Sequence, residues 1–190
     1  MRSILPESEN PALREIAREI PIADIRSARI TKLITEMKAL LAKEKYGVAL
    51  AAPQVGEPIK LFIVSGRALL RQAQDKSSRH PRSDYDQDES GPDLSRAETG
   101  DQVYINPVVL KMSRTKKEKH EGCLSIRGKW GIALRAEKAS VRAYDEHGVA
   151  FTRGASGFLA HVFQHEMDHL EGILYTDKAI ALYDDKPDKE

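Results

Sequence analysis

Apolar residues in the first quarter of the chain recur every three or four positions, the spacing of one face of an amphipathic helix. This pattern predicts a long helix over residues 25–45, with lysines in its last turn and Gly47 as its stop signal. Asn10 suits an N-cap and Pro11 a first helical position, so a shorter helix is predicted over residues 11–20. The apolar face of the long helix is expected to be core; its members are Ile25, Ala28, Leu33, Met37, Leu40 and Leu41.

Further along the chain, the hydrophobic pattern changes to that of β-structure. Runs rich in valine, isoleucine and aromatic residues predict strands over residues 60–65, 103–110, 139–144 and 149–152. A helical pattern returns at residues 156–171 and ends at Gly172. Helices followed by strands and then by one helix indicate an α+β fold, with antiparallel sheets packed around this central helix.

Residues 67–102 differ in composition from the rest of the chain. Asp, Glu, Arg, Ser and Gly dominate residues 74–101, which contain almost no large apolar side chain. Such a segment cannot bury enough surface to offset the entropy lost on ordering, so we predict a flexible surface insertion. A docking loop or a lid is the functional alternative. The 190 residues are otherwise expected to form a single domain.

The charge balance excludes several classes of protein. The chain has 30 basic and 29 acidic residues and a net charge of +1, which indicates neither nucleic acid nor a membrane surface as its main partner. No apolar run approaches the roughly 20 residues that span a bilayer, and the first residues lack the apolar region of a signal peptide. One cysteine forbids an intrachain disulfide and fits a reducing compartment. We therefore expect a soluble, cytoplasmic monomer.

The last predicted helix carries two histidines four residues apart, His165 and His169. Residues with this spacing share one helix face, so both imidazoles can reach one divalent ion. Glu166 follows the first histidine, where its carboxylate is placed to take a proton from a water molecule at the metal. The alternative interpretation is two solvated histidines on a polar helix.

A catalytic metal site usually has three protein ligands, and the third has two candidates. Cys123 is the only cysteine in the chain and follows a glycine, although a lone cysteine is most often a buried apolar residue. His161 lies on the same helix face, but it is eight residues from His169, about 12 Å along the helix axis. That separation disfavours His161 and favours a Cys-His-His site with one open position, Cys123 with His165 and His169.

A loop of small residues, 47–56, follows the long predicted helix. Small side chains permit a close backbone approach, so an extended peptide can lie beside this loop. Gln54 offers an amide donor for a developing oxyanion. The alternative is a tight connection packed with alanines.

Together, these three segments resemble the peptide deformylase family, which has a glycine-rich loop ending in glutamine, a Glu-Gly-Cys-Leu-Ser strand and a Gln-His-Glu-x-Asp-His-type helix. The corresponding residues here are 47–54, 121–125 and 164–169, in the same order. The resemblance covers the chain from about residue 10 to residue 177, without the insertion. It implies removal of the formyl group from N-formylmethionyl nascent peptides, with one divalent ion per chain. Fe²⁺ is implied in the cell, and Zn²⁺, Ni²⁺ and Co²⁺ are the other candidates.

The resemblance also implies a role for each matching residue. Cys123, His165 and His169 would hold the metal, Glu166 would be the general base, and Gln54 and the Leu124 N–H would stabilise the oxyanion. The methionine pocket would be lined by Val48, Phe158, His161 and Val162, and Glu121 would pair with Arg135 to brace the strand. The other residues implied at the substrate are Gly47, Ala49, Glu121 and Gly122.

Four positions depart from the usual family pattern: Ala49, Arg127, Trp130 and His161. Ala49 replaces a glycine, Arg127 a common proline, Trp130 a frequent arginine and His161 an aliphatic residue. The alternative functions are a silent relative, an enzyme for another N-acyl group, and a zinc endopeptidase that uses the same helix motif. Some family members contact the ribosome through a basic C-terminal extension, whereas the tail here is short and mixed in charge.

Overall fold

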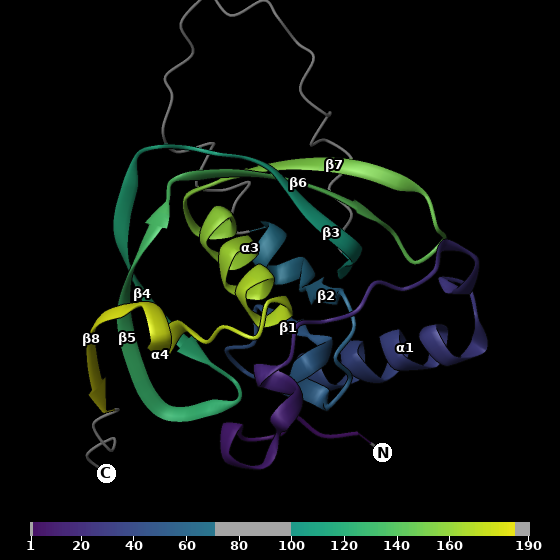
Figure 1. The fold of residues 1–190 in the computed structure, drawn as a ribbon, viewed down its shortest axis with the longest axis horizontal. Coiled ribbons are helices and arrows are strands. Elements are labelled where there is room, and N and C mark those ends of the chain that lie inside the picture. Colours follow the sequence, from purple (N-terminus) through teal and green to yellow (C-terminus); the bar gives the residue numbers. More distant parts are fainter. Residues whose placement is uncertain (1, 71–99, 185–190) are drawn as a thin grey trace, which may run out of the picture.

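The computed structural model describes residues 2–70 and 100–184. Two antiparallel sheets enclose the helix α3 (Gly157–Leu170), and α1 (Ala28–Lys43) lies on the far side of the molecule from the second sheet (Figure 1). The first sheet has the order β1-β2-β3-β6-β7. Its strands are β1 (Ala49–Ala51), β2 (Leu61–Val64), β3 (Gln102–Met112), β6 (Lys138–Tyr144) and β7 (Ala150–Ser156).

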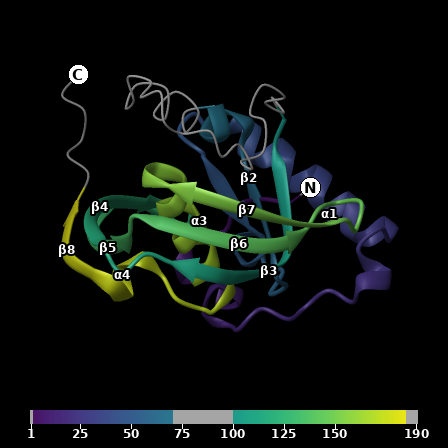
Figure 2. The ribbon, with the colours of Figure 1, turned by 90° about the horizontal axis from the view of Figure 1, so that it is seen from above.

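The second sheet has the order β4-β5-β8 and lies at one end of the molecule, as the view from above also shows (Figure 2). Its strands are β4 (Lys116–Cys123), β5 (Ile126–Ala136) and β8 (Ala179–Asp184). The short helix α4 (Tyr175–Lys178) joins α3 to β8. The described chain also contains four 3-10 turns: η1 (Glu7–Glu9), η2 (Pro11–Arg14), η3 (Ile22–Asp24) and η4 (Ala52–Val55). The predicted α+β fold with a central helix is confirmed.

The four predicted strands are β2, β3, β6 and β7, with ends that differ by a few residues. No strand was predicted over β1, most of β4, β5 or β8. β5 contains Gly128 and Gly131 together with several charged residues, so its alternation of buried and exposed positions is weak. The edge strand β8 is exposed at nearly every position, which leaves no hydrophobic pattern to recognise.

α1 confirms the long predicted helix but begins three residues later, at Ala28. The Ser27 hydroxyl accepts a hydrogen bond from the Ile30 N–H (3.4 Å), so Ser27 is the N-cap. Residues 25–27, expected in the helix, instead form a turn that follows η3. The buried face of α1 consists of Ile30, Leu33, Ile34, Met37 and Leu41.

The predicted helix over residues 11–20 is wrong beyond Arg14. Only η2 is helical, and Asn10 makes no capping hydrogen bond. The following residues are extended because their backbone groups bond to other parts of the chain: the Ala17 N–H donates to the Leu170 carbonyl (2.8 Å) and the Arg18 N–H to the Pro58 carbonyl (2.9 Å). These tertiary hydrogen bonds outweigh the local helical signals.

α3 is anchored to both sheets. On one side, the Phe163 ring packs edge-on against Tyr104 of β3, with centroids 5.2 Å apart. On the other side, Gln164 pairs with the backbone of Ala136 like a neighbouring strand: its Oε1 accepts from the Ala136 N–H (2.8 Å) and its Nε2 donates to the Ala136 carbonyl (2.9 Å). Gly172, with φ of 70°, ends this region as predicted. The helix that carries the histidines is therefore fixed in position.

Residues 66–70, at the start of the predicted insertion, form a helical turn in which Ala68 and Leu69 are buried. Residues 71–99 of that insertion lie outside the described residues, and its last residue, Gln102, already belongs to β3. Among the described helices, none is both long and apolar enough to cross a membrane.

Candidate metal centre

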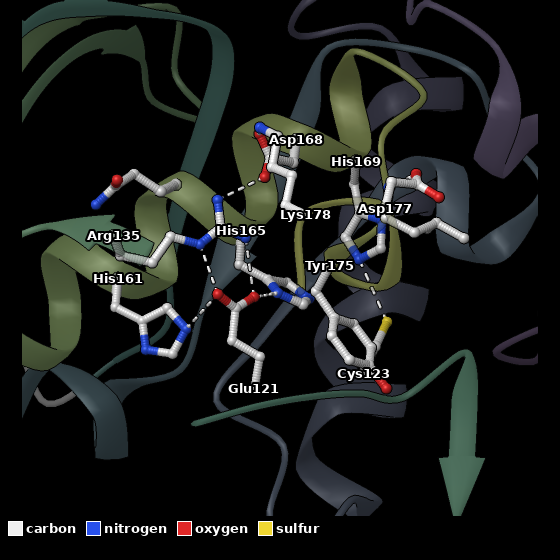
Figure 3. Close-up of polar contacts among 12 residues, drawn as sticks. Glu121, Cys123, Arg135, His161, His165, Asp168, His169, Tyr175, Asp177 and Lys178 are labelled. Atoms are coloured by element: carbon white, nitrogen blue, oxygen red, sulfur yellow. Dashed lines mark hydrogen bonds and ion pairs between the residues drawn. The ribbon is translucent and has the colours of Figure 1, made fainter. Parts of the chain in front are cut away.

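Cys123 lies at the end of β4, facing the two histidines of α3. One ligand atom from each of Cys123, His165 and His169 lies within 4.8 Å of the others, and Cys123 Sγ is 3.3 Å from His169 Nε2 (Figure 3). The two imidazole rings are nearly perpendicular, with an interplanar angle of 86°. The candidate His161 does not join this group; its Nε2 lies 3.3 Å from the Glu121 carboxylate instead. The structure thus brings together the three residues favoured from the sequence.

Glu121, two residues before Cys123, is the acceptor on which the centre is organised (Figure 3). Its carboxylate accepts two hydrogen bonds from Arg135, from Nε (2.5 Å) and Nη2 (2.9 Å), which confirms the ion pair implied by the family resemblance. It also accepts from His165 Nδ1 (2.9 Å) and from His161. Burial alone would raise the pKa of Glu121, but the hydrogen bonds from His161, His165 and Arg135 hold that pKa far below its ordinary value. Glu121 is therefore a buried carboxylate that fixes the ring of His165.

Arg135 also joins this network to the helix through a contact that sequence reasoning missed. Its Nη1 donates to Asp168 Oδ2 (2.6 Å), and Asp168 Oδ1 accepts from Lys178 Nζ of α4 (2.6 Å). Arg135 and Glu121 are both almost fully buried. The only sequence signal was the position of Asp168 directly before a ligand. A carboxylate–guanidinium chain thus connects β4, β5, α3 and α4 around the ligands.

Glu166 lies on α3 between the two histidines and is buried, yet it lines the cleft described below. Its Oε2 has no hydrogen-bond partner among the described residues. Burial raises the pKa of Glu166 to about 7, although the neighbouring His165 opposes this shift. A buried, unpartnered carboxylate oxygen beside the ligands has the placement that a base acting on a water molecule needs.

The residues present fit a divalent ion. Two imidazoles and a thiolate are a known ligand set for Zn²⁺ and other first-row metals. Burial lowers the pKa of His169 well below its ordinary value, which favours the neutral ring, the form that binds metal. Burial opposes a proton on His165, but Cys123 and Glu121 raise the pKa of its ring well above the ordinary value. The same negative surroundings attract a cation.

Gln54 is directed at this centre from η4. Its Oε1 accepts from the Ala51 N–H (2.8 Å), which orients the amide, and its Nε2 lies 3.4 Å from Cys123 Sγ and 3.5 Å from Ser125 Oγ. Leu124, whose N–H is the other implied donor, lies in the turn between β4 and β5 and lines the same cleft. Both implied oxyanion donors are thus close to the candidate ligands.

The N-terminal segment supports both of these loops, a role the sequence analysis did not foresee. The Leu5 N–H donates to the Gln54 carbonyl (3.0 Å), and the Glu7 N–H donates to the Ser125 carbonyl (2.9 Å). The buried side chain of Asn10, predicted as an N-cap, instead donates from Nδ2 to the Pro53 carbonyl (2.8 Å). Residues before η2 therefore bind both walls of the site.

A cleft of about 800 Å³ opens beside the ligands, between the edge strands β1 and β4 of the two sheets. Every residue implied at the substrate lines it: Gly47, Val48, Ala49, Glu121, Gly122, Phe158, His161 and Val162. The other departures from the family pattern, Arg127 and Trp130, line it as well. Arg127 Nη2 reaches Glu44 Oε1, at the end of α1 (2.7 Å), so an exposed ion pair joins the two sides.

An α+β fold built around a helix with two histidines, together with a cysteine and a carboxylate beside an open cleft, defines a candidate metal-binding protein. A family model described as polypeptide deformylase matches residues 1–184. The chain belongs to the peptide deformylase family.

Relatives named as deformylases come from plants and bacteria. Peptide deformylase 1A, chloroplastic/mitochondrial, of Arabidopsis thaliana is 36% identical over 180 residues, which are 93% of this chain and 62% of that protein. Peptide deformylase 2 of Ralstonia nicotianae is 33% identical over 175 residues, 92% of this chain and 85% of that protein. The chain spans only 56% to 62% of the length of the two plant relatives.

Solved structures agree with this relationship. The peptide deformylase from Legionella pneumophila superposes with a TM-score of 0.70 at 28% identity, over 94% of this chain and 85% of that chain. The Thermotoga maritima peptide deformylase gives a TM-score of 0.71 at 25% identity, over 95% and 99% of the two chains.

Proposed function

We propose that this protein hydrolyses the formyl group of N-formylmethionyl peptides and releases formate. The observation that supports this most directly is the convergence of Cys123, His165 and His169 beside a cleft that Glu166 also lines. Three ligands leave an open position, and the carboxylate adjoins it, as hydrolysis requires.

A divalent ion held by these three residues would lower the pKa of a water molecule to about 7 and polarise the formyl carbonyl. Fe²⁺ is the ion we propose for the cell, with Zn²⁺, Ni²⁺ and Co²⁺ as alternatives that the same ligands accept. Glu121 takes no part in the reaction itself; it binds His165 through Nδ1, which would leave Nε2 available to hold the ion.

Glu166 is the proposed general base. Its buried Oε2 accepts a proton from the attacking water as the oxygen–carbon bond to the formyl carbon forms. The same carboxyl then returns the proton to the amine nitrogen as the carbon–nitrogen bond breaks. The products are formate and a peptide with a free amino terminus, so one water is consumed for each bond cleaved.

The oxyanion that forms on the formyl oxygen is held by donors of the protein. Gln54 Nε2 is oriented by its Oε1 contact with the Ala51 N–H, so the donor is in place before substrate arrives. The Leu124 N–H, one residue after the ligand Cys123, is the second donor. Removing a single such donor costs roughly 10²- to 10³-fold in kcat in enzymes of comparable chemistry.

The peptide is proposed to bind as an extended strand between β1 and β4. Both are edge strands of their sheets, so each has backbone groups available for pairing on the side of the cleft. The methionine side chain enters the inner part of the cleft against Val48, Phe158 and Val162. His161 shares this wall, and its hydrogen bond to Glu121 holds the imidazole in place.

The wider setting of the enzyme is part of the same proposal. We propose a single domain with the polar insertion at about residues 67–102, acting as a cytoplasmic monomer on nascent chains. A transient contact with the ribosome would follow from that substrate.

Formate release from a short N-formylmethionyl peptide tests the proposal. Protein prepared without oxygen would be loaded separately with Fe²⁺, Ni²⁺ and Zn²⁺, beside an N-acetyl peptide as a substrate control. We expect Glu166→Ala to retain one ion per chain and to lose turnover. Glu171→Ala, a change at the exposed C-cap of the same helix, is the matched control and is expected to behave as the wild type.

Three outcomes would contradict parts of this proposal. Normal turnover in Glu166→Ala would remove the assignment of the base. Inactivity with each metal, in protein shown to hold one ion per chain, would favour the silent relative or another acyl substrate. Cleavage within an unblocked peptide would instead indicate an endopeptidase.

A further inference from the structure

Trp130 is the only tryptophan of the chain and lies at the cleft with much of its ring exposed. Its exposed fraction is 39%, which is high for so large an apolar side chain. Among the described residues, no aromatic ring packs against it and no side-chain hydrogen bond reaches its indole. An exposed, unpaired tryptophan at the mouth of a cleft has the features of a ligand-binding surface.

The Trp130 ring lies against the backbone of Gly122, the residue directly before the candidate ligand Cys123. A Cβ atom placed on Gly122 would lie 3.0 Å from Cζ3 and 3.1 Å from Cε3 of Trp130. No side chain therefore stands between this ring and the edge of β4. The glycine gives whatever pairs with β4 direct access to the indole.

The two faces of the second sheet differ beside this position. Glu121 is buried and points toward α3, whereas Gly122 is exposed and lies on the opposite, outer face. Trp130 pairs in register with Tyr183 on that outer face, while the next residue, Gly131, faces the Tyr175 ring inside. Trp130 is thus on the outer face, next to the free edge of β4.

An extended peptide that pairs with this edge must follow the same alternation, because successive side chains of a strand point to opposite faces. Under the proposed function, the methionine side chain points inward with Glu121. The side chain of the following residue then points outward, beside Gly122. We propose that Trp130 is a specificity-determining residue, and that its ring binds the side chain of the residue that follows formylmethionine. Aromatic and large aliphatic side chains are the class this surface favours.

This inference rests on the proposed function and refines its substrate class. The test is a series of N-formyl-Met-Xaa-Ser peptides in which Xaa is Phe, Leu, Ala, Asp or Lys. kcat and KM are measured for the metal-loaded wild type and for Trp130→Ala, Trp130→Phe and Trp130→Arg. We expect the wild type to prefer Phe over Ala by about threefold to tenfold in kcat/KM, mainly through a lower KM. An aromatic contact of ordinary strength gives a preference of this size. Trp130→Ala should bring that ratio to about one, and Trp130→Phe should keep most of it.

Leu134→Ala is the matched control. Leu134 is an exposed apolar residue of the same strand, 52% exposed and outside the cleft lining, so its removal should leave the Phe-to-Ala ratio unchanged. Trp130→Arg should replace the aromatic preference with a preference for Asp over Lys. Thermal unfolding and metal content of each variant separate a change in selectivity from a loss of folded protein.

The results that would overturn the inference are distinct from failure of the function. An active wild type with equal kcat/KM for Phe and Ala would refute the binding surface while leaving the deformylase intact. So would a Trp130→Ala variant whose Phe-to-Ala ratio is that of the wild type. Inactivity of the wild type on each peptide would refute the proposed function and, with it, this refinement.

Discussion

Arg135→Met tests whether the network behind the metal ligands holds the fold together. The methionine keeps most of the aliphatic stem but removes the guanidinium that contacts both Glu121 and Asp168. Glu121 is 2% exposed, so its carboxylate is left buried without its main counter-charge. Removing one partner of a buried ion pair typically costs about 3–5 kcal/mol of stability. We therefore expect a loss of that size in the free energy of unfolding.

The loss can be measured by urea denaturation followed by far-ultraviolet circular dichroism, with and without bound metal. In a domain of this size, each kcal/mol shifts the melting temperature by about 2–4 °C, so about 6–20 °C is expected. Arg127→Met is the matched control, because it removes an arginine that is 69% exposed and paired with Glu44 at the surface. Exposed pairs contribute about 0–1 kcal/mol. Equal losses in Arg135→Met and Arg127→Met would refute the assignment of the buried network as a structural brace.

Three further predictions concern the supports around the site. Gly172→Ala should destabilise the protein by about 1–3 kcal/mol, because φ is 70° there and an added Cβ would lie 2.8 Å from the Arg14 carbonyl oxygen. Gly154→Ala is the control, since nothing lies within 4 Å of a Cβ at that position. Equal melting temperatures for the two variants would contradict the predicted strain at Gly172. Asn10→Ala removes one of the two donors to the Pro53 carbonyl of η4, which keeps its bond from the Gly56 N–H, so we expect a loss of about 0.5–1.5 kcal/mol in urea denaturation together with lower kcat. Unchanged kcat would show that this segment does not position the loop. Burial raises the pKa of Asp177, but its hydrogen bond from Arg14 outweighs this effect and lowers the pKa below 3.8. The wild type should therefore be more stable than Asp177→Asn at neutral pH, and this difference should vanish as acid protonates the wild-type carboxyl. A stability difference that persists in acid would contradict the direction of the shift.

The local part of the candidate site could be predicted from the sequence, because helical spacing alone places His165 and His169 together. Cys123 could not be located by helical spacing, since 41 residues of unknown path lie between it and His165; it was favoured because the geometry disfavours His161, and the family resemblance supported the assignment. Asp168 was missed because its partners Arg135 and Lys178 lie in other elements. Only the folded chain shows that one arginine serves two carboxylates.

The strands were predicted where one face is buried and missed where it is not. β2 is buried at each position and β6 alternates between buried and open positions, so both patterns are visible in the sequence. β8 has no buried residue, and its place is fixed by register with β5 rather than by its own composition. Edge strands that depend on a neighbour leave little signal in a single sequence.

The error over residues 15–20 has the same origin and bears on the site. A helix there would satisfy its backbone groups locally, whereas the extended segment donates from the Ala17 N–H to the carbonyl of Leu170, the last residue of α3. Carbonyls at the end of a helix have no partner within it, so this bond closes the helix that carries His165 and His169. Pro58 and Lys60 bind the next residue, Arg18, from the loop that follows η4. The local helical signal was overridden because the extended path connects the metal helix to the loop after Gln54. Residues 15–20 wound into a helix could not make this connection.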